Sequence, residues 1–181
     1  MLRKLLAILA GVVLAVAFVG AAQAASFISS YPPPESIKNQ GNVVQQTQLY
    51  YYRWTYFSDT GEWVTIGPWK ASRYDWPQAD RVASGRRVNV VVRFKDKPDQ
   101  LFVTRYGSVY ANGGPRGSGT KVPVTLYPIK ESPDGYVSKW GAYFKLPPGN
   151  HRITIRTGYF PPDSSHHSFG VETRLAHLKA Y

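Results

Sequence analysis

Apolar and polar side chains alternate with a period of two along three stretches of the chain, residues 88–94, 151–159 and 168–175. One face of each stretch would carry Val88, Val90, Val92 and Phe94, then Ile153, Ile155, Thr157 and Tyr159, then Phe169, Val171, Thr173 and Leu175. The opposite faces would carry Arg87, Asn89 and Arg93, then Arg152, Thr154 and Arg156, then Ser168, Gly170, Glu172 and Arg174. This period is typical of β-strands that are buried on one face.

Shorter runs of strand-forming residues complete the pattern at 43–57, 62–66, 101–106 and 122–126. Ser58-Asp59-Thr60-Gly61 predicts a hairpin turn between the first two, and Pro123 predicts an edge position for the last. Residues 174–181 are the only plausible helical turn after the first 24 residues, and they would equally extend the last strand. Seven or eight short strands separated by turns predict an all-β fold, a single antiparallel β-sandwich spanning residues 43–181.

The N-terminal segment has the pattern of a targeting signal. A basic start, Met1-Leu2-Arg3-Lys4, precedes an uncharged run from Leu5 to Ala22, and Ala22-Gln23-Ala24 offers small residues to a signal peptidase. We predict a signal peptide over residues 1–24 and an exported chain, secreted or associated with the cell surface. The alternative is a retained membrane anchor, since the run approaches the ~20 residues needed to span a bilayer.

Residues 25–42 predict a tether between the leader and the sandwich. Tyr31-Pro32-Pro33-Pro34 favours polyproline II, and Ser36 to Asn42 is polar.

The order of turns and strands from Gly85 to Leu175 resembles a known class of domain. Lys95-Asp96-Lys97-Pro98-Asp99 ends one strand before Leu101-Phe102-Val103 begins the next. The segment from Leu146-Pro147-Pro148-Gly149 to Ile155 then leads into a late strand, and Ser168 to Glu172 follows as the last one. This is similar to the immunoglobulin-like domains of secreted bacterial surface proteins. The resemblance implies a fold and no catalytic residue.

Composition excludes several classes of protein. The chain is 43% apolar and 14% aromatic, too high for a disordered protein, and it lacks cysteine. Disulfides, thiol nucleophiles, cysteine-based metal sites and lipoprotein anchors are therefore excluded. An exported chain without disulfides must be held together by an ordinary hydrophobic core.

The most unusual feature is an aromatic segment, with ten aromatic residues among the 27 residues from Tyr50 to Trp76. These rings either fill the core or present flat surfaces that stack on sugars. Gly67-Pro68-Trp69 and Asp75-Trp76-Pro77 have the composition of loops. We therefore predict Trp69 and Trp76 to be exposed candidates for binding.

Basic residues are the second feature, giving a net charge of +11. Arg87, Arg93, Arg152 and Arg156 all fall on the polar faces of predicted strands. If those strands share a sheet, the four arginines form one cationic surface that would attract anionic polymers. The alternative is an ordinary solvated face. Nucleic acid is a poor partner for an exported chain.

Catalytic and metal sites have little support, and no catalytic residue, metal or cofactor is predicted. His166-His167 would need further ligands from elsewhere, and Asp75 and Asp80 have no fixed register to place them as a carboxylate pair.

The sequence therefore predicts a non-catalytic binding module that contacts an anionic or sugar-rich polymer of the cell envelope. The alternatives are a protein–protein interaction module that pairs through a sheet edge, and a hydrolase with an unrecognised site.

Overall fold

The computed structural model describes residue 32 and residues 35–92, 97–131, 137–160 and 168–181. These residues form strands, turns and loops, and the predicted all-β fold is confirmed. Within these ranges there is no helix with the length and apolarity needed to cross a bilayer. The predicted signal peptide, Arg93 and the His166-His167 pair lie outside the described residues.

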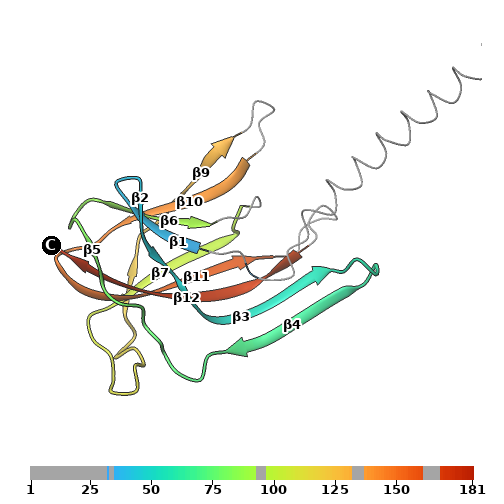
Figure 1. The fold of residues 1–181 in the computed structure, drawn as a ribbon, viewed down its shortest axis with the longest axis horizontal. Coiled ribbons are helices and arrows are strands. Elements are labelled where there is room, and N and C mark those ends of the chain that lie inside the picture. The colour runs from blue at the N-terminus through green and yellow to red at the C-terminus, as the bar shows by residue number, and fades with distance from the viewer. Residues whose placement is uncertain (1–31, 33–34, 93–96, 132–136, 161–167) are drawn as a thin grey trace, which may run out of the picture.

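The strands form two sheets (Figure 1). In chain order the strands are β1 (Glu35–Asn39), β2 (Asn42–Gln46), β3 (Gln48–Phe57), β4 (Trp63–Lys70), β5 (Asp80–Val82), β6 (Arg87–Val92), β7 (Gln100–Tyr106), β8 (Thr120–Val122), β9 (Thr125–Glu131), β10 (Val137–Lys145), β11 (Gly149–Tyr159) and β12 (Ser168–Ala180). The five-stranded sheet has the order β2-β1-β6-β10-β9. The seven-stranded sheet has the order β4-β3-β12-β11-β7-β8, and β5 pairs with the end of β12. All pairs are antiparallel except β5 with β12.

Side chains from both sheets meet in one hydrophobic core. Val88, Val90 and Val92 of β6 are fully buried, as are Ile153 and Ile155 of β11. These are the residues that the alternation placed on apolar faces, so the prediction is confirmed for both strands. Because β6 and β11 turn alternate side chains inward, the core forms between the two sheets.

The predicted orientation of β12 is wrong for its first half. β11 and β12 pair directly, with Thr157 opposite Glu172 and Ile155 opposite Arg174. Opposite residues of an antiparallel pair point to the same face, so Glu172 and Arg174 point into the core. Val171 and Thr173 consequently lie on the outer face and are only half buried, whereas the half-buried Phe169 still packs against core residues.

Inside the sandwich, Glu172 and Arg174 join Glu35 and Thr157 in a buried polar cluster. Nε of Arg174 lies 2.6 Å from Oε2 of Glu172, and the Thr157 hydroxyl donates to Oε1 of Glu35 at 2.5 Å. Burial raises the pKa of Glu35 to about 7, against the smaller opposing effects of the Arg174 charge and the Thr157 hydrogen bond. Burial, helped by the Glu35 charge, also raises the pKa of Glu172. The charge of one buried guanidinium thus acts on two buried carboxyl groups.

The predicted tether is also too long. Glu35–Asn39 forms β1, which pairs with β6 on one side and with β2 on the other. Ile37 is fully buried in the core. Ile37 is the only apolar side chain in residues 36–42, so no apolar alternation in the sequence reveals this strand.

Two local predictions hold, and one open alternative is decided. The hairpin between β3 and β4 turns at residues 58–61, where the amide of Ser58 donates to the carbonyl of Glu62 at 2.7 Å. Pro123 lies between β8 and β9, where the chain passes from one sheet to the other. Residues 174–180 extend the last strand rather than forming a helix.

Candidate functional site

A row of directly paired residues crosses the outer face of the seven-stranded sheet. The row runs through five strands as Lys70, Tyr51, Thr173, Arg156 and Phe102. Cations, aromatic rings and a hydroxyl therefore lie next to one another although they come from distant parts of the sequence. A second row of paired residues lies two positions away along β11 and β7. It runs from Thr154 through Thr104 to Lys121.

These two rows form the floor of a hollow of about 570 Å³. Tyr106 and Tyr74 also line it. The side chain of Phe102 is 45% exposed, a large fraction for a phenyl ring, so its face is available to a ligand. The volume of the hollow can hold a ligand that carries more than one small polar group.

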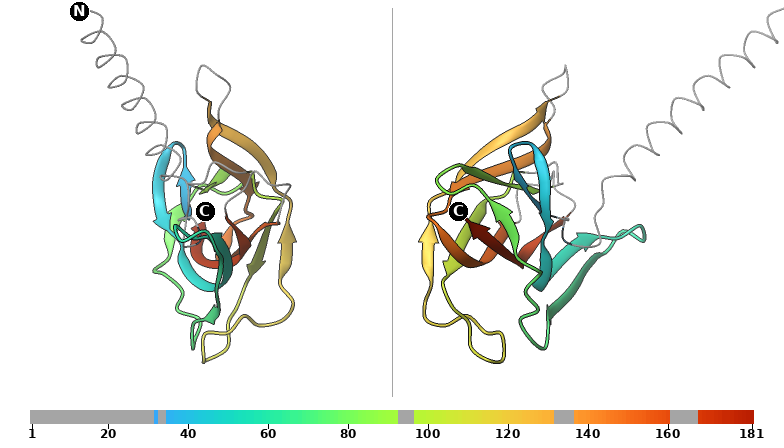
Figure 2. Two further views of the ribbon diagram at one scale, coloured as in Figure 1. Left: turned by 90° about the vertical axis from the view of Figure 1, so that its right-hand side faces the viewer. Right: turned by 60° about the vertical axis from the view of Figure 1, so that its left-hand side comes forward.

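Two rings that line the hollow, Tyr50 and Tyr74, belong to a stack of three aromatic rings. Tyr74 stacks on Tyr50 with ring centroids 4.1 Å apart, and Trp76 stacks on Tyr74 at 5.8 Å. The indole N–H of Trp76 donates to the carbonyl of Gly113 at 2.6 Å. This bond ties the loop after β4 to the loop between β7 and β8, and Figure 2 shows both loops at the same end of the molecule.

Gly113 is required for this contact between loops. Its φ is +83°, and a Cβ atom there would come within 2.6 Å of the backbone oxygen of Tyr74. Only glycine combines that conformation with so close an approach.

A second hollow of about 370 Å³ continues along the same face. It shares Tyr51 and Arg156 with the first and adds Arg53, Val171 and the exposed ring of Phe160. The two hollows together form one groove over β3, β12, β11 and β7, called the groove below.

The groove is cationic. Lys70, Lys121, Arg53 and Arg156 line it, and no carboxylate does among the residues that the structure describes. The ammonium of Lys121 lies 5.9 Å from the ring centroid of Phe102. Burial, with a contribution from the contact with Tyr50, raises the pKa of Tyr74 to about 12.

The four predicted arginines do not form one surface. Arg156 lines the groove, and Arg152 lies on the same outer face, opposite Tyr106 and His177. Partial burial lowers the pKa of Arg152. Arg87 belongs to β6 in the other sheet, so the predicted single cationic face is wrong for this residue.

The two predicted tryptophans have different environments. Trp69 is 44% exposed, but it lies on β4 and stacks on Tyr52, on the face opposite the groove. Trp76 is half buried and held by Gly113, so the prediction of an exposed ring is wrong for it.

The rings that do face the groove were missed as candidates. Phe102 and Tyr106 alternate with the buried Leu101 and Val103 along β7. That alternation is visible in the sequence. It would have placed both rings on the face of the sheet away from the core.

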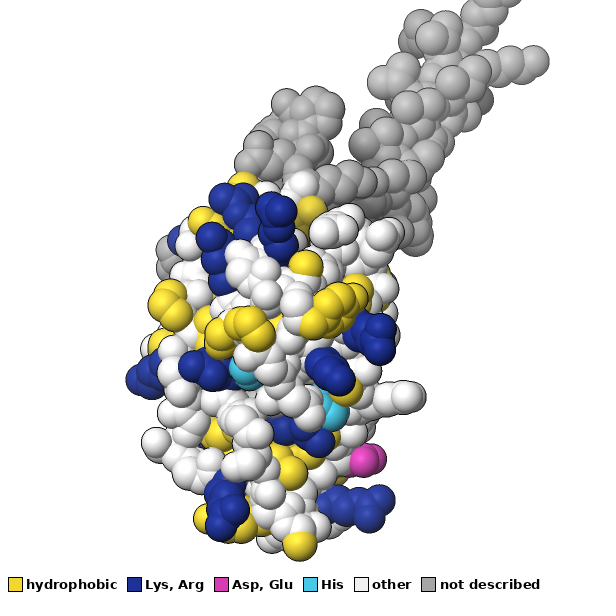
Figure 3. All heavy atoms as spheres, turned by 90° about the vertical axis from the view of Figure 1, so that its left-hand side faces the viewer, with side chains coloured by type: hydrophobic (Ala, Val, Ile, Leu, Met, Phe, Trp, Pro, Cys, Tyr) yellow, Lys and Arg dark blue, Asp and Glu magenta, His cyan; other side chains and the backbone are white. Residues whose placement is uncertain are grey.

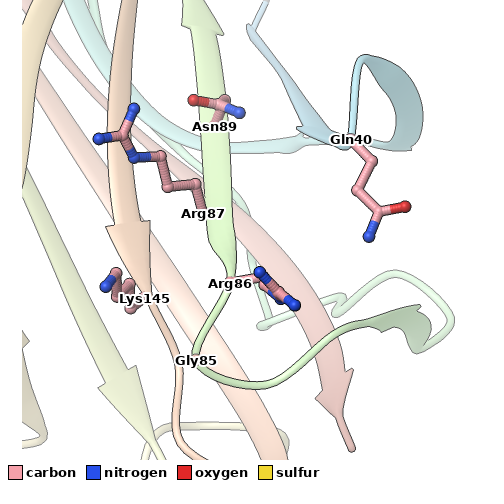
Figure 4. A pocket seen from close by; sticks show the side chains of 6 residues that line it. All are labelled: Gln40, Gly85, Arg86, Arg87, Asn89 and Lys145. Carbon is pink, nitrogen blue, oxygen red and sulfur yellow. The ribbon is translucent and has the colours of Figure 1, made fainter.

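The outer face of the other sheet carries a separate basic pocket (Figure 4). The basic pocket has a volume of about 450 Å³ and is lined by Gln40, Gly85, Arg86, Arg87, Asn89 and Lys145. Figure 3 shows that lysine and arginine side chains also spread over the face that carries the C-terminal end of the chain, with little acidic surface among them.

Across the described ranges there is no group of three or more His, Cys, Asp or Glu side chains that could hold a metal ion. No protein-family model, curated protein or solved structure matches this chain.

Proposed function

We propose that this chain is an exported, non-catalytic module whose groove binds an anionic polysaccharide of the cell envelope. One observation carries the proposal: the groove combines exposed aromatic rings, threonine hydroxyls and four cations without a lining carboxylate in the described structure.

The aromatic rings support a carbohydrate ligand. The ring of Phe102 and the rings of Tyr51 and Tyr106 offer flat apolar surfaces against which the C–H face of a sugar packs. Thr104, Thr154 and the phenol of Tyr74 supply hydroxyl groups beside them. Since sugar units repeat along a chain, a groove that runs over several strands suits a polymer better than a single small molecule.

The charges support an acidic polymer. A groove walled by apolar groups and lined by one sign of charge concentrates counter-ions of the opposite sign. The planar guanidinium groups of Arg53 and Arg156 suit carboxylate oxygens, which they bind with two parallel hydrogen bonds. Uronic acids carry such a carboxylate on each sugar.

The strand order supports an immunoglobulin-like type for this sandwich. The order β1-β6-β10-β9 in one sheet and β7-β11-β12 in the other corresponds to the A-B-E-D and C-F-G order of that fold. The hairpin of β3 and β4 is then an addition beside the last strand, and it contributes Tyr51, Arg53 and Lys70 to the groove. Export through the predicted leader would bring this surface to the envelope.

The test uses polygalacturonate and its methyl-esterified form, which keeps the sugars and removes the charge. Calorimetry at low salt should show saturable binding of polygalacturonate and much weaker binding of the ester. Phe102→Ala and Lys121→Gln should each weaken binding about tenfold, since each removes one contact worth about 1.5 kcal/mol. Arg73→Gln, an exposed arginine that lines neither hollow, is the charge-matched control. Equal losses in all three variants, or equal affinity for both polymers, would contradict the proposal.

Pairing of two chains through a sheet edge is the second candidate function. β4 is an edge strand with Trp63 54% and Trp69 44% exposed. However, Pro68 lacks an amide donor, and the register shifts between Tyr52 and Trp54 of the neighbouring strand. Both features interrupt regular pairing, so we place the groove first. Concentration-dependent sedimentation would detect a dimer.

A further inference from the structure

We propose that the basic pocket binds phosphate, as a second ligand site independent of the groove. The pocket lies on the outer face of the five-stranded sheet, whereas the groove lies on the outer face of the seven-stranded sheet. The two sites use different residues, so either proposal can fail without the other.

The arrangement of charges in the pocket is unfavourable without a ligand. Arg87 of β6 and Lys145 of β10 are directly paired across the sheet, and like charges in that position destabilise it. Arg86 adds a third cation next to them, and no carboxylate lines the pocket in the described part of the chain. A bound anion of charge near −2 would remove this repulsion.

A backbone hydrogen bond fixes the position of the turn that carries part of the pocket. The amide of Gly85 donates to the carbonyl of Leu146 at 2.9 Å, which attaches the turn before β6 to the end of β10. Gly85 has a φ of +65° that lets the turn make this bond. Arg86, Arg87 and Lys145 are therefore kept at the same corner of the sheet.

Neighbouring aromatic residues orient two of the donors. The guanidinium of Arg87 lies 4.4 Å from the ring centroid of Tyr143. The hydroxyl of Tyr127 donates to Oδ1 of Asn89 at 2.8 Å, which leaves the amide N–H groups of Asn89 to face another partner. Figure 4 shows the Asn89 nitrogen directed away from Arg87, toward the side where Gln40 lies.

The turn between β1 and β2 brings Gln40 to the pocket. Gln40 and Gly41 are the two central residues of this hairpin, and both have the positive φ that such a tight turn needs, +50° and +86°. Gln40 lies on the far side of Arg86 from Lys145 and brings a second amide to the pocket (Figure 4).

This set of donors suits phosphate better than a carboxylate. Phosphate has more acceptor oxygens and a larger charge, and arginine binds it with two parallel hydrogen bonds. In Figure 4, Arg87 and Lys145 lie on one side of β6 and Arg86 lies on the other, so donors face the pocket from both sides of the strand. The volume of about 450 Å³ leaves room beside one phosphate for the organic group of an ester.

The first experiment is a titration with inorganic phosphate, followed by amide chemical shifts, with sodium chloride at matched ionic strength as the reference. We expect saturable shifts at Gln40, Gly85 and Arg86. Arg86→Gln and Arg87→Gln should each weaken binding about tenfold, because each removes a charged hydrogen bond. Arg73→Gln should leave the affinity unchanged. Linear shifts that chloride reproduces, or an equal loss in Arg73→Gln, would overturn the proposal.

Gln40→Gly separates binding from folding. This variant relieves the positive φ and removes one amide, so the protein should unfold no more easily while phosphate affinity falls several-fold. Unchanged phosphate affinity in Gln40→Gly and in Arg86→Gln together would show that the pocket is not the site. Phe102→Ala, a groove variant, should bind phosphate like the unmodified protein.

The source of the phosphate ester is tested with glycerol phosphate and with vesicles that contain phosphatidylglycerol. Binding to vesicles that glycerol phosphate displaces, and that Arg86→Gln weakens, would assign the pocket to a lipid headgroup. Saturable binding of glycerol phosphate without attachment to vesicles would assign it to a soluble or polymeric ester. Binding of neither ester would overturn the proposal.

Discussion

β11 and β12 lie side by side and pair over eleven residues, yet they distribute their side chains in opposite ways. β11 turns Ile153 and Ile155 toward the core and Arg156 toward the groove. β12 turns Glu172 and Arg174 inward. The shared layer between the sheets therefore changes from apolar to charged within a few residues.

This difference shows that strand register, rather than the polarity of single residues, decides which side chains of β12 point inward. Once β11 and β12 pair with Thr157 opposite Glu172, the direction of every side chain follows from the pleat. A shift of one residue would turn Glu172 outward but would also expose Leu178, which is fully buried at the other end of the strand. The observed register buries the C-terminal end of β12, which carries Leu178. At the other end it leaves Glu172 and Arg174 inside the core, in a polar cluster with Glu35 and Thr157.

The largest expected effect comes from leaving buried charge without a partner. Arg174→Met removes the guanidinium that faces Glu172 at 2.6 Å, and breaking such a pair costs about 3–5 kcal/mol of stability. Urea unfolding at pH 7 measures it. Arg156→Met removes the same charge from the outer face of β11 and should change stability by about 0.5 kcal/mol or less. Similar losses in both variants would mean that the two faces do not differ as described.

The apolar part of the layer should be sensitive to lost volume. Ile155→Ala removes a fully buried side chain and should cost about 2–5 kcal/mol through lost transfer energy and the cavity that remains. Val171→Ala on the outer face of β12 should cost less than about 1 kcal/mol, because that side chain is only half buried. Comparable denaturation midpoints for the two variants would contradict the assignment of faces.

The charged part of the layer should make stability depend on pH. The folded protein raises the pKa of Glu35 from 4.5 to about 7, so stability is greatest below pH 4.5 and falls as pH rises to about 7. Glu35→Gln removes the part of this dependence that comes from Glu35 and should stabilise the protein by up to about 3 kcal/mol at pH 8, with little gain at pH 4. The raised pKa of the buried Glu172 leaves a smaller fall in stability with rising pH. Urea midpoints across this range measure the effect. Glu62→Gln, an exposed control, should leave the pH profile unchanged.

The smallest effect on stability should accompany a change in binding. Val171→Glu places a carboxylate in the groove on a half-buried position, so it should change stability by about 0.5 kcal/mol while weakening polygalacturonate binding several-fold. Val171→Gln, of the same size and without charge, should bind nearly as the unmodified protein does. Equal binding by both variants would mean that charge in the second hollow does not matter to the ligand.

The amount that could be predicted differs between the two strands. The alternation in β11 predicted its buried and exposed faces because every apolar residue there points inward. The same rule failed for residues 171–174 of β12, where Val171 and Thr173 line the groove and Glu172 and Arg174 point into the core. Periodicity establishes that two faces exist, and only packing determines which of them is covered.

The candidate site, too, could be predicted from the sequence only in part. Arg156 and Arg87 were correctly placed on faces away from the core, but their membership in different sheets depends on pairing between segments far apart in the chain. The groove's row from Lys70 to Phe102 exists only because five strands align in register. The prediction of an exposed Trp76 failed because its hydrogen-bond partner, Gly113, lies 37 residues away in the chain and local sequence gives no sign of it.

The sequence by itself determined the all-β class, the turns and the apolar faces of β6 and β11, since these depend on side-chain period and on residues that favour turns. Tertiary structure alone decided that Glu35 belongs to a strand, that β12 buries Glu172 and Arg174, and that the basic residues separate into a groove and a pocket. The physical reason is that local pattern sets the conformation of a strand. Its neighbours, its register and the side that becomes dry are set by contacts between distant segments, which bury the greatest apolar area at the least cost in unpaired charge.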